Sequence, residues 1–404
     1  MKELHTGRLY WPTTRAKANS FTALEEHTAA KIAVVGGGMS GVMCAHTFVT
    51  AGLDTLLIER GDIAGGSTSA NTGLLQFCND VMLVDLIGQI GRDAAERFYR
   101  RCKEAVDQLA LVASTLPEDV GFRRRSSLYY ASTEQDLPKL KKEFEALLAC
   151  GLDVEYWSPD DIAAHFPFRK PGAIVTHGDA EVNPYQFVSG LADAAIRAGL
   201  RAYENTDVTA HEKRADGTHR LVTSNGFQID ADYVVYAVGY EPEELRGKLV
   251  KASLNRSYAL VTGVQPSLGQ WHQNFLLWET ARPYLYLRTT IDGRVVVGGL
   301  DEEIEQPIHS EKKLARKTGQ LMEKLHALFP DLTAEAEYEW NATFGESQDN
   351  LPFIGEDPLT PGVFYSLGYG GNGTVYSTIG AHIIRDMIRD KSPHPLSFIG
   401  IRGS

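Results

Sequence analysis

The sequence predicts an α/β fold whose first unit is a parallel sheet covered by helices. Residues 31–35, Lys-Ile-Ala-Val-Val, form a short apolar run of the kind that makes buried parallel strands. Gly36, Gly38 and Gly41 follow in the spacing G-x-G-x-x-G, and a second apolar run at 55–58 ends on Glu59. Strand, glycines, helix, strand and acid in this order, over residues 31–78, are typical of a Rossmann-type βαβ unit.

Each of these residues has a physical role in binding a dinucleotide. Gly36 allows the tight turn after the strand, Gly38 admits a pyrophosphate close to the backbone, and Gly41 lets the helix pack closely on the sheet. The helix that begins near Ser40 offers free N–H groups and the positive end of its dipole. Glu59 can accept hydrogen bonds from ribose hydroxyls and would repel a 2′-phosphate, which disfavours an NADP-type ligand. The sequence therefore predicts a dinucleotide site, with a glycine-rich turn in an ordinary α/β domain as the alternative.

Three further segments resemble those of one flavoprotein family. Loop 65–73 reads Gly-Gly-Ser-Thr-Ser-Ala-Asn-Thr-Gly, residues 234–239 read Val-Val-Tyr-Ala-Val-Gly, and residues 368–373 read Gly-Tyr-Gly-Gly-Asn-Gly. With the βαβ unit, they resemble the D-amino-acid oxidase-like (DAO) family of FAD-dependent oxidoreductases, and within it the group of glycine oxidase, monomeric sarcosine oxidase and γ-glutamylputrescine oxidoreductase. The resemblance spans nearly the whole chain. It implies a Rossmann-type FAD-binding domain and a second α+β substrate lobe built on an antiparallel sheet.

The resemblance also implies how the chain is divided between the lobes. The FAD-binding domain is expected to comprise residues 31–80, 178–254 and 336–392, and the substrate lobe residues 81–177 and 255–335. Residues 1–30 form an N-terminal arm and residues 393–404 a C-terminal tail. Tyr10 and Trp11 leave two interpretations of the arm open, a flexible tail or a segment that packs on the body or on a neighbouring subunit.

The cofactor implied by the resemblance is one non-covalent FAD per chain. Some members of the family tether the flavin through a His in the loop after the second strand or a Cys near residue 343, and this chain has Ser69, Ala70 and Thr343 at these places. N–H groups at the start of the last helix are expected to face the pyrimidine edge of the flavin. The residues predicted to bind FAD are Gly36, Gly38, Met39, Ser40, Gly41, Glu59, Arg60, Gly66, Ser67, Thr68, Asn71, Thr72, Gly73, Leu74, Val208, Gly239, Gly370, Gly371, Asn372, Gly373 and Thr374.

The implied reaction is oxidation of the C–N bond of an amine or amino acid. In the family, a neutral amine gives a hydride from its α-carbon to flavin N5, and the imine product hydrolyses in water. Oxidation of a C–O bond, as in a 2-hydroxy acid, is the alternative function, and a flavin-containing scaffold without turnover is a third class. Oxygen and another electron acceptor both stay open, so oxidase and dehydrogenase are not distinguished.

The predicted catalytic residues are Tyr284, Tyr286 and Arg288, which alternate along one strand and therefore share a face. Two interpretations of this face compete. It either looks onto the substrate cavity above the flavin or is the solvated face of an antiparallel sheet. In the first case Arg288 can grip a substrate carboxylate bidentately.

The cationic groups that bind substrate or activate oxygen in family members have no counterparts at the aligned positions. Phe344 stands in place of the arginine of glycine oxidase-like members, and Gln76 and Val375 in place of an arginine and a lysine of monomeric sarcosine oxidase. We therefore expect an amine, or an amino acid held through Arg288, rather than a small α-amino acid. Val296 stands at the position of the lysine above the flavin in monomeric sarcosine oxidase, which predicts poor oxygen reactivity.

Charge and composition narrow the possible partners. The 404 residues carry a net charge of −12, which disfavours nucleic acid and an anionic membrane surface. No apolar run is long enough to cross a bilayer, and the first residues lack the apolar core of a signal peptide. The four cysteines have no C-x-x-C spacing, and the histidines have no metal-binding spacing. These features predict a cytoplasmic enzyme without metal, whose partners are a small substrate and an electron acceptor, with a homo-oligomer left open.

Overall fold

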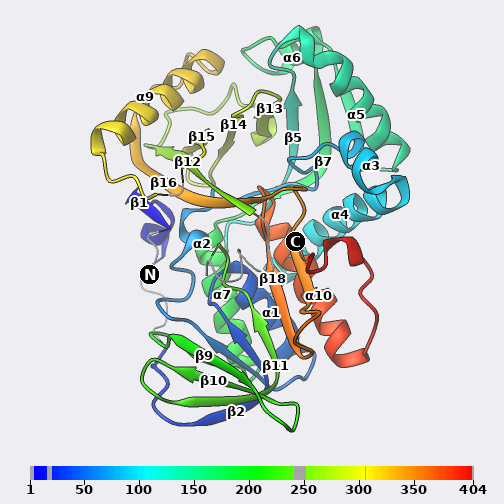
Figure 1. The fold of residues 1–404 in the computed structure, drawn as a ribbon. Helices are drawn as coiled ribbons and strands as arrows, with labels where there is room; N and C mark the ends of the chain where they lie inside the picture. Colours follow the sequence, from blue (N-terminus) through cyan, green and yellow to red (C-terminus); the bar gives the residue numbers. More distant parts are fainter. Residues whose placement is uncertain (1–3, 16–20, 241–251, 305, 403–404) are drawn as a thin grey trace.

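The computed structural model describes residues 4–15, 21–240, 252–304 and 306–402. These residues form two lobes, each built on its own sheet (Figure 1). One sheet has eight strands and contains the predicted βαβ unit, and the other has ten strands that are mostly antiparallel. The predicted fold class, a Rossmann-type domain with a second lobe on an antiparallel sheet, is confirmed.

The eight-stranded sheet positions the glycine-rich turn. Its order is β17-β18-β11-β2-β3-β8, with β9 and β10 attached beyond β11. β2 (Thr28–Val35) lies between β3 (Thr55–Ile58) and β11 (Gln228–Tyr236), and both neighbours run parallel to it. The side chains of β3 are buried throughout, as expected for an apolar strand covered on both faces. On one face, the helices α1 (Met39–Thr50), α7 (Pro184–Arg197) and α10 (Gly373–Asp390) contribute to a single apolar core.

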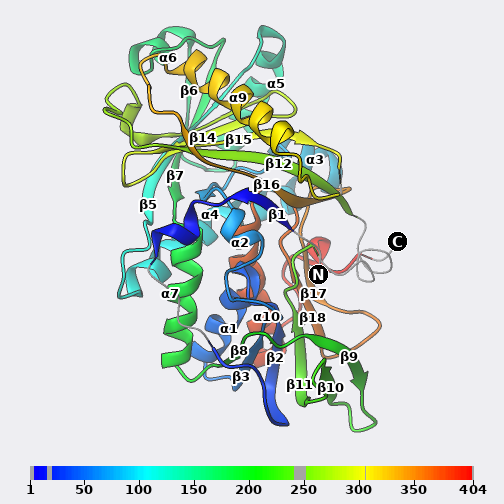
Figure 2. The same cartoon turned by 90° about the vertical axis from the view of Figure 1, so that its left-hand side faces the viewer.

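The ten-stranded sheet roofs the first lobe. Its order is β1-β16-β12-β15-β14-β13-β5-β7-β4, and β6 pairs with β7. Figure 2 shows this sheet lying across the upper part of the molecule, with α9 (Glu311–Leu328) on its outer side and α1, α2 and α10 below it. An apolar core between α9 and strands β12, β14 and β15 holds the outer face. The inner face contacts the first lobe, where Trp340 Nε1 donates to the carbonyl of Ala70 at 3.0 Å.

The N-terminal arm packs on the body, so the second of the two interpretations holds for its described part. β1 (His5–Arg8) runs antiparallel to β16 (Ala336–Ser347). Trp11 is only 2% exposed, and its Nε1 donates to the carbonyl of Asn71 at 2.5 Å. The arm thus joins the edge of the large sheet to the loop after α2.

The strands cross the lobe boundaries expected from the sequence. β4, β7 and β16 all lie in the ten-stranded sheet. The sequence assigned β4 and β16 to the FAD-binding domain, and its boundary at residue 178 falls inside β7. For β7 and β16 the reason is their length, because a long strand has no break in its sequence pattern where the lobe changes, and β4 is too short, at two residues, to have a pattern of its own. Residues 241–251 of the predicted FAD-binding domain lie outside the described residues.

The other helices and strands of the two lobes have the following bounds. The helices are η1 (Trp11–Thr14), α2 (Ser67–Ala70), α3 (Leu83–Ile90), α4 (Arg92–Thr115), η2 (Glu134–Asp136), α5 (Leu137–Ala149), α6 (Pro159–His165), η3 (His272–Asn274) and η4 (Ser397–Ile399). The strands are β4 (Leu74–Leu75), β5 (Arg123–Tyr130), β6 (Val154–Trp157), β7 (Ala173–Glu181), β8 (Arg201–Tyr203), β9 (Val208–Lys213), β10 (His219–Thr223), β12 (Ala252–Thr262), β13 (Leu276–Glu279), β14 (Leu285–Thr289), β15 (Val295–Glu302), β17 (Phe353–Glu356) and β18 (Val363–Leu367).

Candidate functional site

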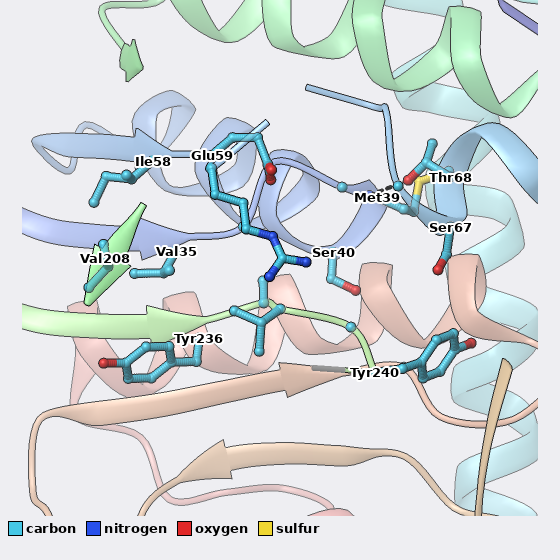
Figure 3. A pocket seen from close by; sticks show the side chains of 18 of the residues that line it. Val35, Met39, Ser40, Ile58, Glu59, Ser67, Thr68, Val208, Tyr236 and Tyr240 are labelled. Atoms are coloured by element: carbon cyan, nitrogen blue, oxygen red, sulfur yellow. Dashed lines mark hydrogen bonds between the residues drawn. The ribbon is translucent and has the colours of Figure 1, made fainter. Parts of the chain in front are cut away.

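A cavity of about 550 Å³ lies at the ends of β2, β3 and β11, where α1, α2 and α10 begin. This volume is within the range of small-molecule and cofactor sites. Figure 3 shows its division into two ends. Val35, Ile58, Val208 and Tyr236 gather at one end, and Ser67, Thr68 and Tyr240 lie at the other. The position at the carboxyl ends of parallel strands is the usual one for ligands of such sheets.

The glycine-rich turn has the geometry that the spacing predicts. Gly36 has φ +111°, and a Cβ there would lie 2.4 Å from the carbonyl of Ala237. A Cβ on Gly41 would lie 1.7 Å from the carbonyl of Gly36, so this glycine is required for close packing of α1 on the turn. Gly38 lines the cavity, and its Cβ would meet only Thr68 Oγ1, at 3.4 Å. A ligand can therefore approach the backbone at Gly38 without hindrance.

Glu59 is held at the middle of the cavity by two backbone groups. Its Oε2 accepts from Gly37 N at 2.6 Å, and its Oε1 accepts from Gly61 N at 2.8 Å. Figure 3 shows Glu59 between the apolar end at Ile58 and the polar residues near Met39. Each carboxylate oxygen keeps further acceptor capacity. The carboxylate is therefore oriented in advance for a ligand with hydroxyl groups.

Two helices direct their N-termini at this cavity. The first residues of α1 and of α10, including Met39, Ser40, Gly373 and Thr374, line it. The hydroxyls of Ser40 and Ser377 lie 2.6 Å apart and tie the two helices together. The N-cap residues Gly38 and Asn372 make no side-chain cap, and at the start of α1, among the described residues, only Met39 N is engaged by a side chain, donating to Thr68 Oγ1 at 2.9 Å. The positive dipole ends therefore act together on whatever anionic group the cavity holds.

Most of the residues predicted to bind FAD line the cavity. They are Gly36, Gly38, Met39, Ser40, Glu59, Arg60, Gly66, Ser67, Thr68, Asn71, Val208, Gly239, Gly373 and Thr374. Seven predicted residues are not among its lining: Gly41, Thr72, Gly73, Leu74, Gly370, Gly371 and Asn372.

The last three of these residues shape the turn before α10. Gly370 has φ +99°, Gly371 N donates to Asp80 Oδ2 at 2.7 Å, and the Asn372 side chain donates to the carbonyl of Cys78 at 2.7 Å. The turn is thereby fixed to residues 78–80. Its ends, Gly368 and Gly373, both line the cavity.

The sequence prediction missed a second set of lining residues. Val35, Ile58 and Tyr236 are the last residues of strands that were recognised, so the strand ends were a usable signal. Leu4 and Tyr240 had no such signal, because they reach the cavity through long-range packing. The other missed residues are Thr206, Asp207, Thr209, Ala210, His211, Ala237, Val238, Tyr365, Gly368 and Ser377. Burial, followed by the charge of His219, lowers the pKa of His211 to about 4, so this imidazole is neutral at pH 7.

Arg288 is only 2% exposed, and its donors are engaged by the protein. The guanidinium donates to the carbonyls of Thr72 at 2.7 Å, Val182 at 2.9 Å and Thr289 at 3.1 Å. It also lies 3.5 Å from Glu181 and 4.9 Å from the centre of the Trp11 ring. This geometry favours a role in holding the loop after α2 over the expected grip on a substrate carboxylate.

Tyr286 and Arg288 share the inner face of the sheet, because their cross-strand partners Gly298 and Val296 alternate in the same way. Tyr286 lies with its Oη 3.3 Å from Ser257 Oγ, and Tyr284 Oη donates to Asp80 Oδ1 at 3.1 Å. The two tyrosine rings are 5.5 Å apart. Burial raises the pKa of both phenols, so they stay protonated at neutral pH. The solvated interpretation of this face does not hold, since it packs on the first lobe.

The positions expected to lack cationic groups are occupied by well-packed side chains. Gln76 is buried, with its Nε2 3.3 Å from Ser127 Oγ, and Val375 is buried in the first turn of α10. Val296 is fully buried in the cluster that includes Tyr10 and Trp11. Among the described residues, no group of three His, Cys, Asp or Glu could hold a metal ion. Within the same residues, no helix is long and apolar enough to span a membrane.

Comparison with known proteins identifies the family to which this chain is similar. A family model described as FAD dependent oxidoreductase (DAO) matches residues 31–387. Gamma-glutamylputrescine oxidoreductase of Escherichia coli (strain K12) is 24% identical over 94% of this chain and 88% of its own length. Glycine oxidase of Geobacillus kaustophilus (strain HTA426) is 23% identical over 89% of this chain and 93% of its own. The crystal structure of glycine oxidase from Geobacillus kaustophilus superposes with a TM-score of 0.77 at 21% identity, covering 93% of this chain and 98% of that one.

Proposed function

Because the chain belongs to the DAO family of FAD-dependent oxidoreductases, we propose that it oxidises the C–N bond of an amine or amino acid to an imine, which water then hydrolyses. The chain is an FAD-dependent amine or amino-acid oxidoreductase at the level of its family. The oxidised bond, C–N, and the imine product are what we propose beyond this family-level activity.

The observation that carries the proposal is the convergence of two helix N-termini, those of α1 and α10, on one cavity. The residues present fit FAD. Gly38 and Ser40 would hold the pyrophosphate at the start of α1, and Glu59 would bind the ribose hydroxyls. Val208 belongs to the apolar end, which suits the adenine. Gly373 and Thr374, at the start of α10, would face the flavin ring system.

FAD, when bound, supplies the acceptor for the two electrons removed from the substrate. The residues of the chain bind and orient the cofactor and the substrate, and they exclude water from the site. The inner face of the ten-stranded sheet covers the turn before α10, and Tyr284 joins the two through its hydrogen bond to Asp80. A substrate amine that binds as the neutral base needs no strong general base, and Tyr284 and Tyr286 remain protonated donors.

The test is anaerobic titration of the FAD-loaded enzyme with amines, amino acids and 2-hydroxy acids. We expect the absorbance of oxidised flavin to disappear with an amine or amino acid, together with release of ammonia or a smaller amine. A response confined to 2-hydroxy acids would replace C–N by C–O oxidation. No response to any member of the panel would contradict a role as an enzyme of this class.

The mode of FAD attachment has its own test. Ser69, Ala70 and Thr343 offer neither a thiol nor an imidazole for a covalent bond to flavin. We therefore expect all yellow colour to leave the protein on acid precipitation. Colour retained in the precipitate would contradict non-covalent binding.

A further inference from the structure

Three carboxylates meet where the inner face of the ten-stranded sheet covers the turn before α10. They are Asp80 from the first lobe, Asp301 at the end of β15 and Glu346 at the end of β16. Asp80 accepts from Gly371 N at 2.7 Å and from Tyr284 Oη at 3.1 Å. These two bonds place it beside the turn whose ends line the cavity. We call Asp80, Asp301 and Glu346 the acidic trio.

Asp301 and Glu346 approach the same place from the sheet. Asp301 shares a hydrogen bond with Ser257, whose hydroxyl also lies 3.3 Å from Tyr286 Oη. The Oδ1 of Asp301 is buried and has no hydrogen-bond partner. Glu346 follows Gly345, whose carbonyl accepts from Gly370 N at 2.8 Å. Both carboxylates therefore lie next to residues that touch the turn or the tyrosine pair.

The three charges repel one another. Burial raises the pKa of Asp301 to about 6, and Glu346 and Asp80 act in the same direction. Burial also raises the pKa of Glu346, with Asp80 and Glu303 adding to the effect. The guanidinium of Arg282 opposes the shift of both groups. It is exposed, donates to the carbonyl of Asp80 at 2.9 Å and stacks on Tyr284. Among the described groups named here, four acidic side chains, Glu303 included, stand against the single cation Arg282, which leaves an excess of negative charge.

Asn255 is an independent sign of a ligand at this place. It is 7% exposed and lies on β12 opposite Phe344 of β16, on the inner face of the sheet. Its Nδ2 donates to Glu346, but its Oδ1 is buried without a partner. A buried amide oxygen without a donor is unfavourable, because it has lost its hydrogen bonds to water. A donor group from outside the protein would satisfy either of these two open oxygens, Asn255 Oδ1 or Asp301 Oδ1.

Aromatic rings complete the surroundings of the trio. Tyr284 and Tyr286 form one pair, and Tyr240 and Tyr369 form an edge-to-face pair with centres 5.3 Å apart. A Cβ on Gly345 would lie 2.7 Å from Tyr240 and 2.6 Å from Tyr369, so this second pair packs beside Glu346 on the opposite face of β16, and Tyr284 and Tyr286 are the rings on the side of the trio. Carboxylates set among aromatic faces are the surroundings that an alkylammonium group prefers.

We propose that the acidic trio binds an ammonium group of the substrate, so that the substrate is a diamine or polyamine without a carboxylate beside the oxidised carbon. One nitrogen is oxidised, and a second, protonated nitrogen is held by Asp80, Asp301 and Glu346. A carboxylate at the same place would be repelled by three anions and would lack the partner that a buried charge requires. The proposal rests on the proposed oxidation of C–N bonds and names the class of amine.

The test measures binding apart from turnover. The probe is a four-carbon diamine methylated so that the carbons next to nitrogen carry no hydrogen, which makes oxidation to an imine impossible. Its control is the monoamine of the same length and methylation. Calorimetry on the FAD-loaded enzyme at low ionic strength should show that the diamine binds at least about tenfold more tightly than the monoamine. Binding of both probes with equal affinity would overturn the proposal.

Matched variants locate the binding. Asp301→Asn combined with Glu346→Gln keeps the shapes of both side chains and removes two charges, so the preference for the diamine should fall at least about tenfold. Glu311→Gln removes one charge on α9, on the outer side of the sheet, and should leave the preference unchanged. FAD content and melting temperature are recorded for each variant, and Asp301→Asn alone is used if the double variant loses FAD. An undiminished preference in a variant that retains FAD would overturn the proposal.

The two proposals fail in different ways. Bleaching of the flavin by sarcosine or monoamines, with no preference for putrescine over n-butylamine, would refute the role of the trio and leave C–N oxidation intact. Bleaching by 2-hydroxy acids alone would refute C–N oxidation itself.

Discussion

Arg288→Leu tests whether this arginine supports the fold or binds a substrate carboxylate. The change removes the guanidinium and keeps an apolar side chain beside Trp11. It leaves the carbonyls of Thr72, Val182 and Thr289 without this donor and removes one neighbour of Glu181. The structure therefore predicts a loss of stability, with little direct effect on substrates.

The expected loss follows from the number of partners and their burial. Removing one member of a buried ion pair costs about 3–5 kcal/mol. Glu181 keeps a shorter contact with Arg125, at 2.8 Å against 3.5 Å to Arg288, so it is not left alone. We expect the lower end of the range, about 3 kcal/mol, including the lost hydrogen bonds to carbonyls. For a chain of this size, that corresponds to a melting temperature lower by about 3–4 °C.

The assay compares thermal unfolding of the FAD-loaded variant with its kinetics on amines and on amino acids. Arg123→Leu is the control, because Arg123 pairs with Asp119 on the surface and its loss should cost no more than about 1 kcal/mol. We expect Arg288→Leu to melt earlier, with KM values for amines and for amino acids changed alike. An unchanged melting temperature together with a selective loss of about a hundredfold in kcat/KM for carboxylate-bearing substrates would refute the structural role.

Three other predictions concern the cofactor, the trio and oxygen. Glu59→Gln should weaken FAD binding by about tenfold to a hundredfold, since one charge-assisted hydrogen bond is worth about 1.5–3 kcal/mol. Fluorescence titration of the apoprotein with FAD measures the affinity, and an unchanged affinity would exclude Glu59 as the ribose ligand. Asp301, with a pKa raised to about 6, ionises as the pH rises, so the non-oxidisable diamine should bind about tenfold more tightly at about pH 7 than at about pH 5. Asp301→Asn should reduce this dependence to the part that Glu346 contributes. The uncharged, buried Val296 predicts slow hydrogen peroxide formation with any good substrate, and rapid peroxide production would contradict that expectation.

Local features of the site could be predicted from the sequence, because their evidence lies within a few dozen residues. The apolar run before Gly36, the spacing to Gly41 and the acid at 59 predicted the turn, the helix and the carboxylate that the structure brings to one cavity. Alternation also placed Tyr286 and Arg288 on one face. Each of these inferences depends on chain geometry alone.

The alternation of residues along a strand shows which side chains share a face of the sheet, but it does not show which other residues pack on that face. Arg288 was expected to meet a substrate, but Trp11 from the arm and carbonyls from three separate segments surround it. The acidic trio could not be predicted from the sequence for the same reason. Asp80 and Glu346 are more than two hundred residues apart and lie close together only because the two lobes pack on each other. Single acids far apart in a sequence resemble ordinary surface residues.

The pairing of β1 with β16 has a consequence for the order in which the protein assembles during synthesis. Leu4, at the start of the arm, lines the cavity, and its carbonyl accepts from Thr343 N at 2.8 Å. β1 thus has as its partner a strand more than three hundred residues later in the chain, and it must wait unpaired until residues 336–347 have been made. Until then the wall that Leu4 supplies is missing, and the cavity is complete only after α10, which follows β16 in the chain, has also been made. We therefore expect that a weaker pairing of β1 with β16 would loosen this wall and speed the exchange of a bound cofactor, although β1 belongs to the other sheet.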